Sequence, residues 1–120
     1  MGTAEVENAI NEHEDVIESA VVGYPDDIKG EGIYAYVIVS TKLNDDEIKN
    51  QIINVVRKVI GPIAKPDKIQ IVSGLPKTRS GKIMRRILRK VASNDFQNLG
   101  DTSTLLNPDV VKEIIDGAII

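Results

Sequence analysis

The 120-residue sequence contains no cysteine and no tryptophan, and its one histidine is His13. The absence of cysteine excludes disulfides, thiolate zinc sites and a cysteine nucleophile. A single histidine leaves little room for a histidine-based triad or a multi-histidine metal site. No apolar run approaches the roughly 18 residues of a membrane-spanning helix, and no signal-peptide pattern opens the chain. We therefore expect a cytoplasmic location and no membrane partner.

The charged residues are segregated along the chain. The net charge is only −3, and 42% apolar residues are enough to bury the core of one domain. Residues 1–31 nevertheless contain nine acids and one base, whereas residues 77–90 contain seven bases and no acid. This asymmetry indicates an anionic partner, although a solvated helix face explains it about equally well.

The hydrophobic pattern predicts an α+β fold, a small sheet of about three strands packed against two or three helices. Thr3 and Asn44 are the expected N-caps of the first two helices, and residues 24–27 read as a turn. The middle strand is apolar enough to be buried on both faces, and the last strand has one polar face. An irregular C-terminal tail is expected over 93–107. The pattern predicts helices over 4–13, 45–60, 82–92 and 108–116, and strands over 16–23, 33–39 and 67–72.

The basic segment begins with two hydroxyls, three cations and a glycine in Lys77–Lys82. The pattern places this loop directly at the N-terminus of the 82–92 helix, where free N–H groups and the helix dipole favour an anion. A P-loop is excluded because Gly74 and Gly81 are separated by six residues and Ile83 follows the lysine. Nucleic-acid binding is disfavoured because no aromatic residue is interleaved with the bases.

The 82–92 helix has one apolar and one basic side. We expect its apolar side to pack on the sheet and its basic side to face solvent. The apolar side consists of Ile83, Ile87, Leu88 and Val91, and the basic side of Arg85, Arg86, Arg89 and Lys90.

A resemblance to a known family lies in Leu75–Arg86, which reads LPKTRSGKIMRR. This segment resembles the signature of the C-terminal domain of acyl-adenylate-forming enzymes. The likeness runs from residue 2 to about 113 and includes Ile28–Gly30, Arg57–Pro62 and the tail Asn98–Leu105. The Gly-Asp-Thr-Ser-Thr sequence within that tail is typical of the branch that activates acetate or propionate.

The resemblance implies an AMP-forming acetate–CoA ligase that uses ATP, coenzyme A (CoA) and Mg²⁺. In this family a large N-terminal domain holds most of both substrate sites, and the small C-terminal domain rotates between the two half-reactions. Residues 1–120 correspond to the small domain, and the hinge and large domain would precede Gly2. We therefore expect this polypeptide alone to be inactive. Which of the two acids is preferred does not follow from these residues.

The resemblance also implies roles for individual residues. Lys82 matches the catalytic lysine of adenylation, which in the family is acetylated by an acetyltransferase and restored by a deacetylase. Arg57 matches a contact to the nucleotide phosphate of CoA, and Gly30 and Gly32 border its pantetheine passage. An ordinary turn before a strand explains the two glycines nearly as well.

A metal site is implied for the end of the first helix. Asn11, His13 and Val16 match positions that can hold Mg²⁺ in related enzymes. An exposed histidine at a helix end is the alternative interpretation.

One alternative function remains open at this point. The 77–90 segment could serve a free-standing module that binds an anionic partner, either nucleic acid or an acidic protein.

Overall fold

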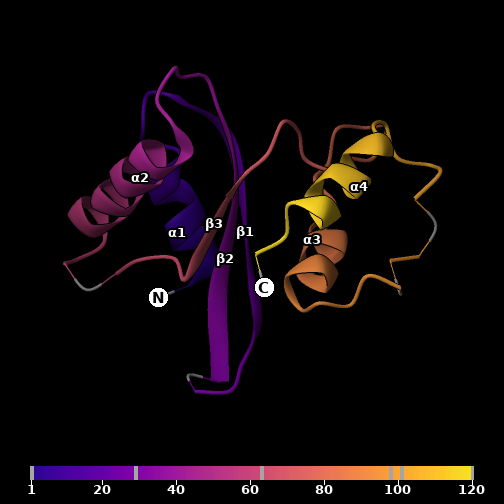
Figure 1. Ribbon diagram of the computed structural model, residues 1–120, viewed down its shortest axis with the longest axis horizontal. Helices are drawn as coiled ribbons and strands as arrows, with labels where there is room; N and C mark the ends of the chain where they lie inside the picture. Colours follow the sequence, from indigo (N-terminus) through magenta and orange to yellow (C-terminus); the bar gives the residue numbers. More distant parts are fainter. Residues whose placement is uncertain (1, 29, 63, 98, 101, 120) are drawn as a thin grey trace.

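The structure is a computed structural model that describes residues 2–28, 30–62, 64–97, 99–100 and 102–119. Lys29, Asn98 and Asp101 of the family resemblance lie outside these residues. Within the described ranges the chain forms four helices and a three-stranded sheet, which confirms the predicted α+β fold. Figure 1 shows α1 and α2 on one side of the sheet and α3 and α4 on the other. The elements are α1 (Thr3–Ile10), β1 (Val16–Asp26), β2 (Gly30–Val39), α2 (Asp45–Val59), β3 (Lys68–Ile71), α3 (Arg85–Ala92) and α4 (Asp109–Asp116).

Strand β2 lies at the centre of the sheet. It pairs antiparallel with β1 and parallel with β3, in the order β1-β2-β3. Because a parallel pair needs a long crossover connection, α2 links β2 to β3. The four consecutive residues Tyr34–Val37 are fully buried, which confirms the prediction of a strand covered on both faces.

The side chains of β1 and β2 alternate between two separate cores, as the period-two geometry of a strand requires. We call these the α3/α4 core and the α1/α2 core, after the helices that cover them. To the α3/α4 core the two strands contribute Ala20, Val22, Tyr24, Tyr34 and Tyr36. To the α1/α2 core they contribute Val21, Ile33, Ala35 and Val37.

A buried polar network ties the C-terminal helix to the sheet. The Tyr34 hydroxyl donates to Gln70 Oε1 and accepts from the Ile119 amide at 2.9 Å. Gln70 Nε2 in turn donates to the Ile114 carbonyl at 3.1 Å. The polar face predicted for β3 is therefore not exposed at Gln70, whose side chain is buried. A buried amide is tolerated there because its oxygen and nitrogen both have partners.

Two boundaries near the N-terminus differ from the prediction. The first helix is capped by Gly2, not by Thr3, and it ends at Ile10, three residues early. Strand β1 continues through the predicted turn at 24–27 as far as Asp26. Strand β1 is an edge strand of this sheet. Pro25 has no N–H to donate, and this is tolerated at an edge because outward-facing N–H groups there have no partner strand.

Helices α2 and α4 agree with the prediction to within one residue at each end. Helix α2 is capped by Asn44, whose side chain accepts from the Glu47 amide. Helix α4 follows Pro108. None of the described helices has the length and hydropathy that a membrane crossing needs.

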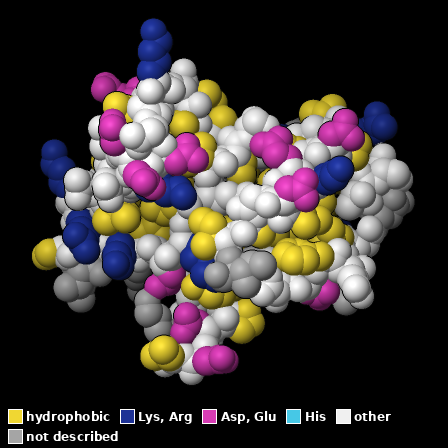
Figure 2. Space-filling model, viewed as in Figure 1, with side chains coloured by type: hydrophobic (Ala, Val, Ile, Leu, Met, Phe, Trp, Pro, Cys, Tyr) yellow, Lys and Arg dark blue, Asp and Glu magenta, His cyan; other side chains and the backbone are white. Residues whose placement is uncertain are grey.

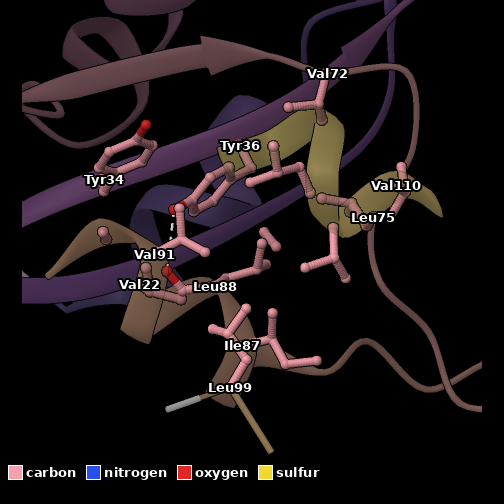
Figure 3. Packing of buried hydrophobic residues seen from close by; sticks show 14 of the residues in the cluster. Val22, Tyr34, Tyr36, Val72, Leu75, Ile87, Leu88, Val91, Leu99 and Val110 are labelled. Atoms are coloured by element: carbon pink, nitrogen blue, oxygen red, sulfur yellow. Dashed lines mark hydrogen bonds between the residues drawn. The ribbon is translucent and has the colours of Figure 1, made fainter. Parts of the chain in front are cut away.

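Tyr36 lies in the α3/α4 core, where its hydroxyl donates to the Leu88 carbonyl at 3.0 Å (Figure 3). Burial, with a smaller contribution from Tyr34, raises the pKa of Tyr36 well above its ordinary value near 10. The unfolded chain therefore loses this proton first. The stabilisation of the folded state by the protonated Tyr36 hydroxyl is present below about pH 10 and declines as the pH rises further.

We expect Tyr36→Phe to lower the free energy of unfolding by about 1 kcal/mol at pH 8, because one buried hydrogen bond is lost. Between pH 8 and pH 11 the variant should lose less stability than the parent protein. Urea denaturation at both pH values measures the difference. Equal losses in the two proteins would contradict this account of Tyr36.

Candidate functional site

Lys82 lies at the end of a tight hairpin turn. The Thr78 amide donates to the Lys82 carbonyl, and the Gly81 amide donates to the Thr78 carbonyl, both at 2.9 Å. Gly81 has φ +92°, a left-handed conformation that strains other residues. This pattern is that of a three-residue hairpin loop whose last residue is left-handed. Gly81 therefore sets the turn that presents Lys82.

The hairpin occupies the place where the sequence predicted the first turn of a helix. Helix α3 begins at Arg85, so the predicted 82–92 helix starts three residues too early. The amides of Lys82 and Met84 donate within the hairpin, at 3.1 and 2.8 Å. Because these amides are already bonded, the predicted anion site at a helix N-terminus beside Lys82 is wrong.

The bases of residues 77–90, here called the basic patch, are in large part paired within the domain. The basic side of α3 faces outward as predicted, with Arg86 and Arg89 exposed, but Arg85, Arg86 and Lys90 also bond to partners within the domain. Figure 2 shows acidic and basic side chains interspersed on the face drawn there. The pairs are Lys77 with Glu18 at 2.8 Å, Arg85 with Glu7 at 2.7 Å, Lys90 with Asp95 at 3.7 Å, and Arg86 with the Leu99 carbonyl at 2.8 Å.

Lys82 differs from those cations. Its side chain is exposed, and none of the ion pairs between described residues includes it. Arg79 and Arg89 are exposed in the same way. Of these three, only Lys82 follows a turn fixed by a left-handed glycine, so its backbone is held while its ammonium group remains available to a ligand.

The hairpin rests on the C-terminal tail. Asn107 Nδ2 donates to the Leu75 carbonyl at 2.8 Å, and Asn107 Oδ1 accepts from the Lys77 amide at 3.1 Å. The Leu106 amide donates to the Lys77 carbonyl at 2.9 Å. The sequence predicted an irregular tail over 93–107 and assigned it no role. No local pattern could have shown a contact across about thirty positions.

Arg57 lies on the other side of the sheet from Lys82. It is exposed in the last turn of α2, a helix that covers the α1/α2 core. The hairpin that carries Lys82 packs through Ile83 and Met84 on the α3/α4 core. The structure therefore does not bring these two predicted site residues together.

The two glycines predicted to border a CoA passage have different surroundings. Gly30 begins β2 with φ +84° and has open space where a side chain would lie. Gly32 is buried beneath the Tyr24 ring, and a Cβ there would lie 2.3 Å from Tyr24 Cζ. The same ring meets Tyr34 edge-on and has Lys68 Nζ 4.5 Å from its centroid. Gly32 is therefore required by packing, whatever its relation to a ligand.

The positions predicted to hold Mg²⁺ are engaged with their neighbours. His13 Nδ1 accepts from the Asp15 amide at 3.0 Å, so its Nε2 carries the proton that points to Gln51 Oε1 at 2.7 Å. Asn11 Oδ1 accepts from Ser19 Oγ at 2.8 Å. Among the described residues no three His, Cys, Asp or Glu side chains gather to hold a metal. In this arrangement the His13 nitrogens and Asn11 Oδ1 are already hydrogen-bonded, and a magnesium site at Asn11, His13 and Val16 stays a prediction.

The three-layer fold and the sequence that leads to the Lys82 hairpin are those of a known protein family. The family described as the AMP-binding enzyme C-terminal domain matches residues 5–82, and the chain belongs to this family. The family predicted from the sequence is thereby confirmed.

Particular relatives narrow the class. The chain is 62% identical over 117 residues to an acetyl-coenzyme A synthetase of Parvibaculum lavamentivorans and to one of Alkalilimnicola ehrlichii. Each alignment covers 97% of this chain and 18% of the relative. The crystal structure of Brucella canis acyl-CoA synthetase superposes with a TM-score of 0.69 at 40% identity, over 75% of this chain and 17% of that one. The chain thus spans less than a fifth of the length of these relatives.

The packing of Gly32 under Tyr24 predicts an energetic coupling between them. Gly32→Ala should lower the free energy of unfolding by about 3 kcal/mol, because the new methyl group overlaps the ring. In a Tyr24→Ala background the same change should cost less than about 1 kcal/mol. Gly30→Ala is the control and should cost about 1 kcal/mol in both backgrounds, since only its φ is strained. Equal costs of Gly32→Ala in both backgrounds, by urea denaturation, would contradict the packing role.

Proposed function

We propose that residues 1–120 form the mobile C-terminal domain of a cytoplasmic AMP-forming acetate–CoA ligase, and that Lys82 serves its adenylation step. The 62% identity to acetyl-coenzyme A synthetases supports the choice of reaction. The observation that carries the role of Lys82 is its placement at the end of a fixed turn, where it is exposed and has no acidic partner among the described residues. Catalysis requires the N-terminal domain as a partner, so this chain alone is expected to be inactive.

In the first half-reaction, a carboxylate oxygen of acetate forms a bond to the α-phosphorus of ATP. The bond from that phosphorus to the pyrophosphate oxygen breaks, which leaves acetyl-adenylate. Two anions must approach, and negative charge increases on the non-bridging oxygens in the transition state. The ammonium group of Lys82 would lie between the carboxylate and the phosphate and stabilise that charge by about 3–4 kcal/mol. Mg²⁺ would enter with ATP and neutralise phosphate charge.

In the second half-reaction, the sulfur of CoA attacks the acetyl carbonyl and AMP leaves. Arg57 would bind the nucleotide phosphate of CoA, since a guanidinium matches phosphate geometry with two parallel N–H donors. Gly30 would border the pantetheine arm, because its surroundings are open. Lys82 and Arg57 lie on opposite sides of the sheet, so the domain would rotate to present each to one active site in turn.

The same placement suits Lys82 as a regulatory acetylation site. An exposed lysine at a hairpin turn is accessible to an acetyltransferase and to a deacetylase. Acetylation would remove the positive charge and with it the stabilisation of the transition state. Regulation then needs no conformational change in the domain.

A free-standing anion-binding module is disfavoured by the pairing of the basic patch. Four of its seven bases are already bonded to acids or to a carbonyl within the domain. A nucleic acid would have to displace those partners to use them. We therefore propose the ligase function alone.

Lys82→Ala in the full-length ligase should lower the rate of acetyl-adenylate formation by about 10²- to 10³-fold, as expected for one lost transition-state donor. Thioester formation from supplied acetyl-adenylate should be retained. Pyrophosphate release and acetyl-CoA formation, assayed separately, measure the two steps. Lys112→Ala is the matched control, an exposed lysine on α4. Equal losses in both half-reactions would contradict the role of Lys82.

Arg57→Ala should impair the second half-reaction and not the first. Loss of a charged hydrogen-bonding group should lower kcat/KM for CoA by about 10- to 100-fold and leave adenylation unchanged. Lys58→Ala removes the neighbouring exposed cation of the same helix turn and should change neither step. If both variants weaken CoA use equally, Arg57 acts only as part of a diffuse positive surface.

A further inference from the structure

Ser73–Lys77 is the segment that leads into the Lys82 hairpin, and the C-terminal segment 105–113 holds it at both ends. At the first end, Glu113 accepts from the Ser73 amide at 3.1 Å and from the Ser73 hydroxyl at 2.6 Å. At the second end, Asn107 binds the backbone on both sides of residue 76. These bonds join parts of the sequence 30 to 40 residues apart.

The backbone around Lys77 has two bonded edges. The Pro76 carbonyl and the Thr78 amide bond to the opposite arm of the hairpin. The Lys77 amide and carbonyl point the other way and bond to Asn107 and Leu106. Segment 105–113 therefore supplies hydrogen-bond partners along the outer edge of the hairpin, as a third strand would.

The same two segments are packed together through apolar groups. Leu75 is 1% exposed and shares the α3/α4 core with Leu105, Val110 and Val111, and Figure 3 shows Leu75 beside Val110. A Cβ at Gly74 would already lie 3.1 Å from Val110 Cγ2. The approach segment therefore fits closely against segment 105–113.

This support matters because an isolated two-stranded hairpin is only marginally stable in water. A catalytic group must be held within about 0.5 Å of its productive position, and the flexible stem of a lysine gives no rigidity of its own. The position of the ammonium group then depends on the backbone at residue 82.

We propose that segment 105–113 is a clamp that positions Lys82 for adenylation, with Asn107 and Glu113 as its positioning residues. The inference rests on the proposed function of Lys82. Segment 105–113 lies beyond residues 5–82, the part of the chain that the family description matches.

Amide hydrogen exchange on the 120-residue chain tests the clamp without any activity assay. In Asn107→Ala the amides of Thr78, Lys82 and Met84 should exchange at least about 10-fold faster, while those of Tyr34–Val37 keep their rates. Asn54→Ala, an exposed change on α2, should alter neither set. Unchanged hairpin amides, or an equal acceleration of both sets, would overturn the proposal.

The two half-reactions of the full-length ligase test what the clamp does. Asn107→Ala and Glu113→Ala should each slow adenylation about 10-fold and leave thioester formation from supplied acetyl-adenylate within about two-fold. Glu113→Gln keeps an acceptor for the Ser73 amide and should restore adenylation. Equal losses in both half-reactions, or no rescue by Glu113→Gln, would overturn the clamp.

Failure of the clamp and failure of the proposed function give different results. If Lys82→Ala stops adenylation while the clamp variants leave it intact, the clamp alone is wrong. If Lys82→Ala leaves adenylation intact, the proposed function is wrong, whatever the exchange rates show.

Discussion

The burial of β2 on both faces is the constraint on which the rest of the domain depends. Its consecutive side chains enter two different cores, so every segment that packs on one core lies on the opposite side from every segment that packs on the other. A slip of one residue in the strand register would exchange the two sets. The separation of Lys82 from Arg57 follows directly, and so does the need to rotate the domain if both residues serve one active site.

Charge is segregated along the sequence but much less so in space. The acidic N-terminal third folds against the basic segment, where Glu7 pairs with Arg85 and Glu18 pairs with Lys77. Glu7 also accepts from the Val21 amide, so one carboxylate joins α1, β1 and α3. The fold thus pairs three of the seven bases of the basic patch with acids. Lys82 is exposed and takes part in none of the ion pairs between described residues, so it is available to a ligand.

The sequence predicted features that local spacing decides and missed those that distant contacts decide. Three features were predictable because each depends on residues that are near one another in the sequence. These are the Asn44 cap, the apolar spacing of α2 and the burial of β2. The start of α3 was not, because the Thr78 amide bonds to the Lys82 carbonyl, which the first turn of a helix would use as an acceptor. The burial of Gln70 and the contacts of Asn107 depend on α4 and on the tail, which reach them across more than thirty positions. Lys82 itself was identified by family resemblance, and spacing alone gave only a basic loop.

In the proposed function, two opposite faces of one small domain serve two different steps. The most direct measurement is a pair of crystal structures of the full-length ligase, one with a non-reactive acetyl-adenylate analogue and one with AMP and CoA. The account predicts Lys82 Nζ about 3 Å from the adenylate oxygens in the first, and Arg57 on the CoA phosphate in the second with Lys82 facing solvent. If Lys82 and Arg57 contact their ligands in a single orientation of the domain, the account is contradicted.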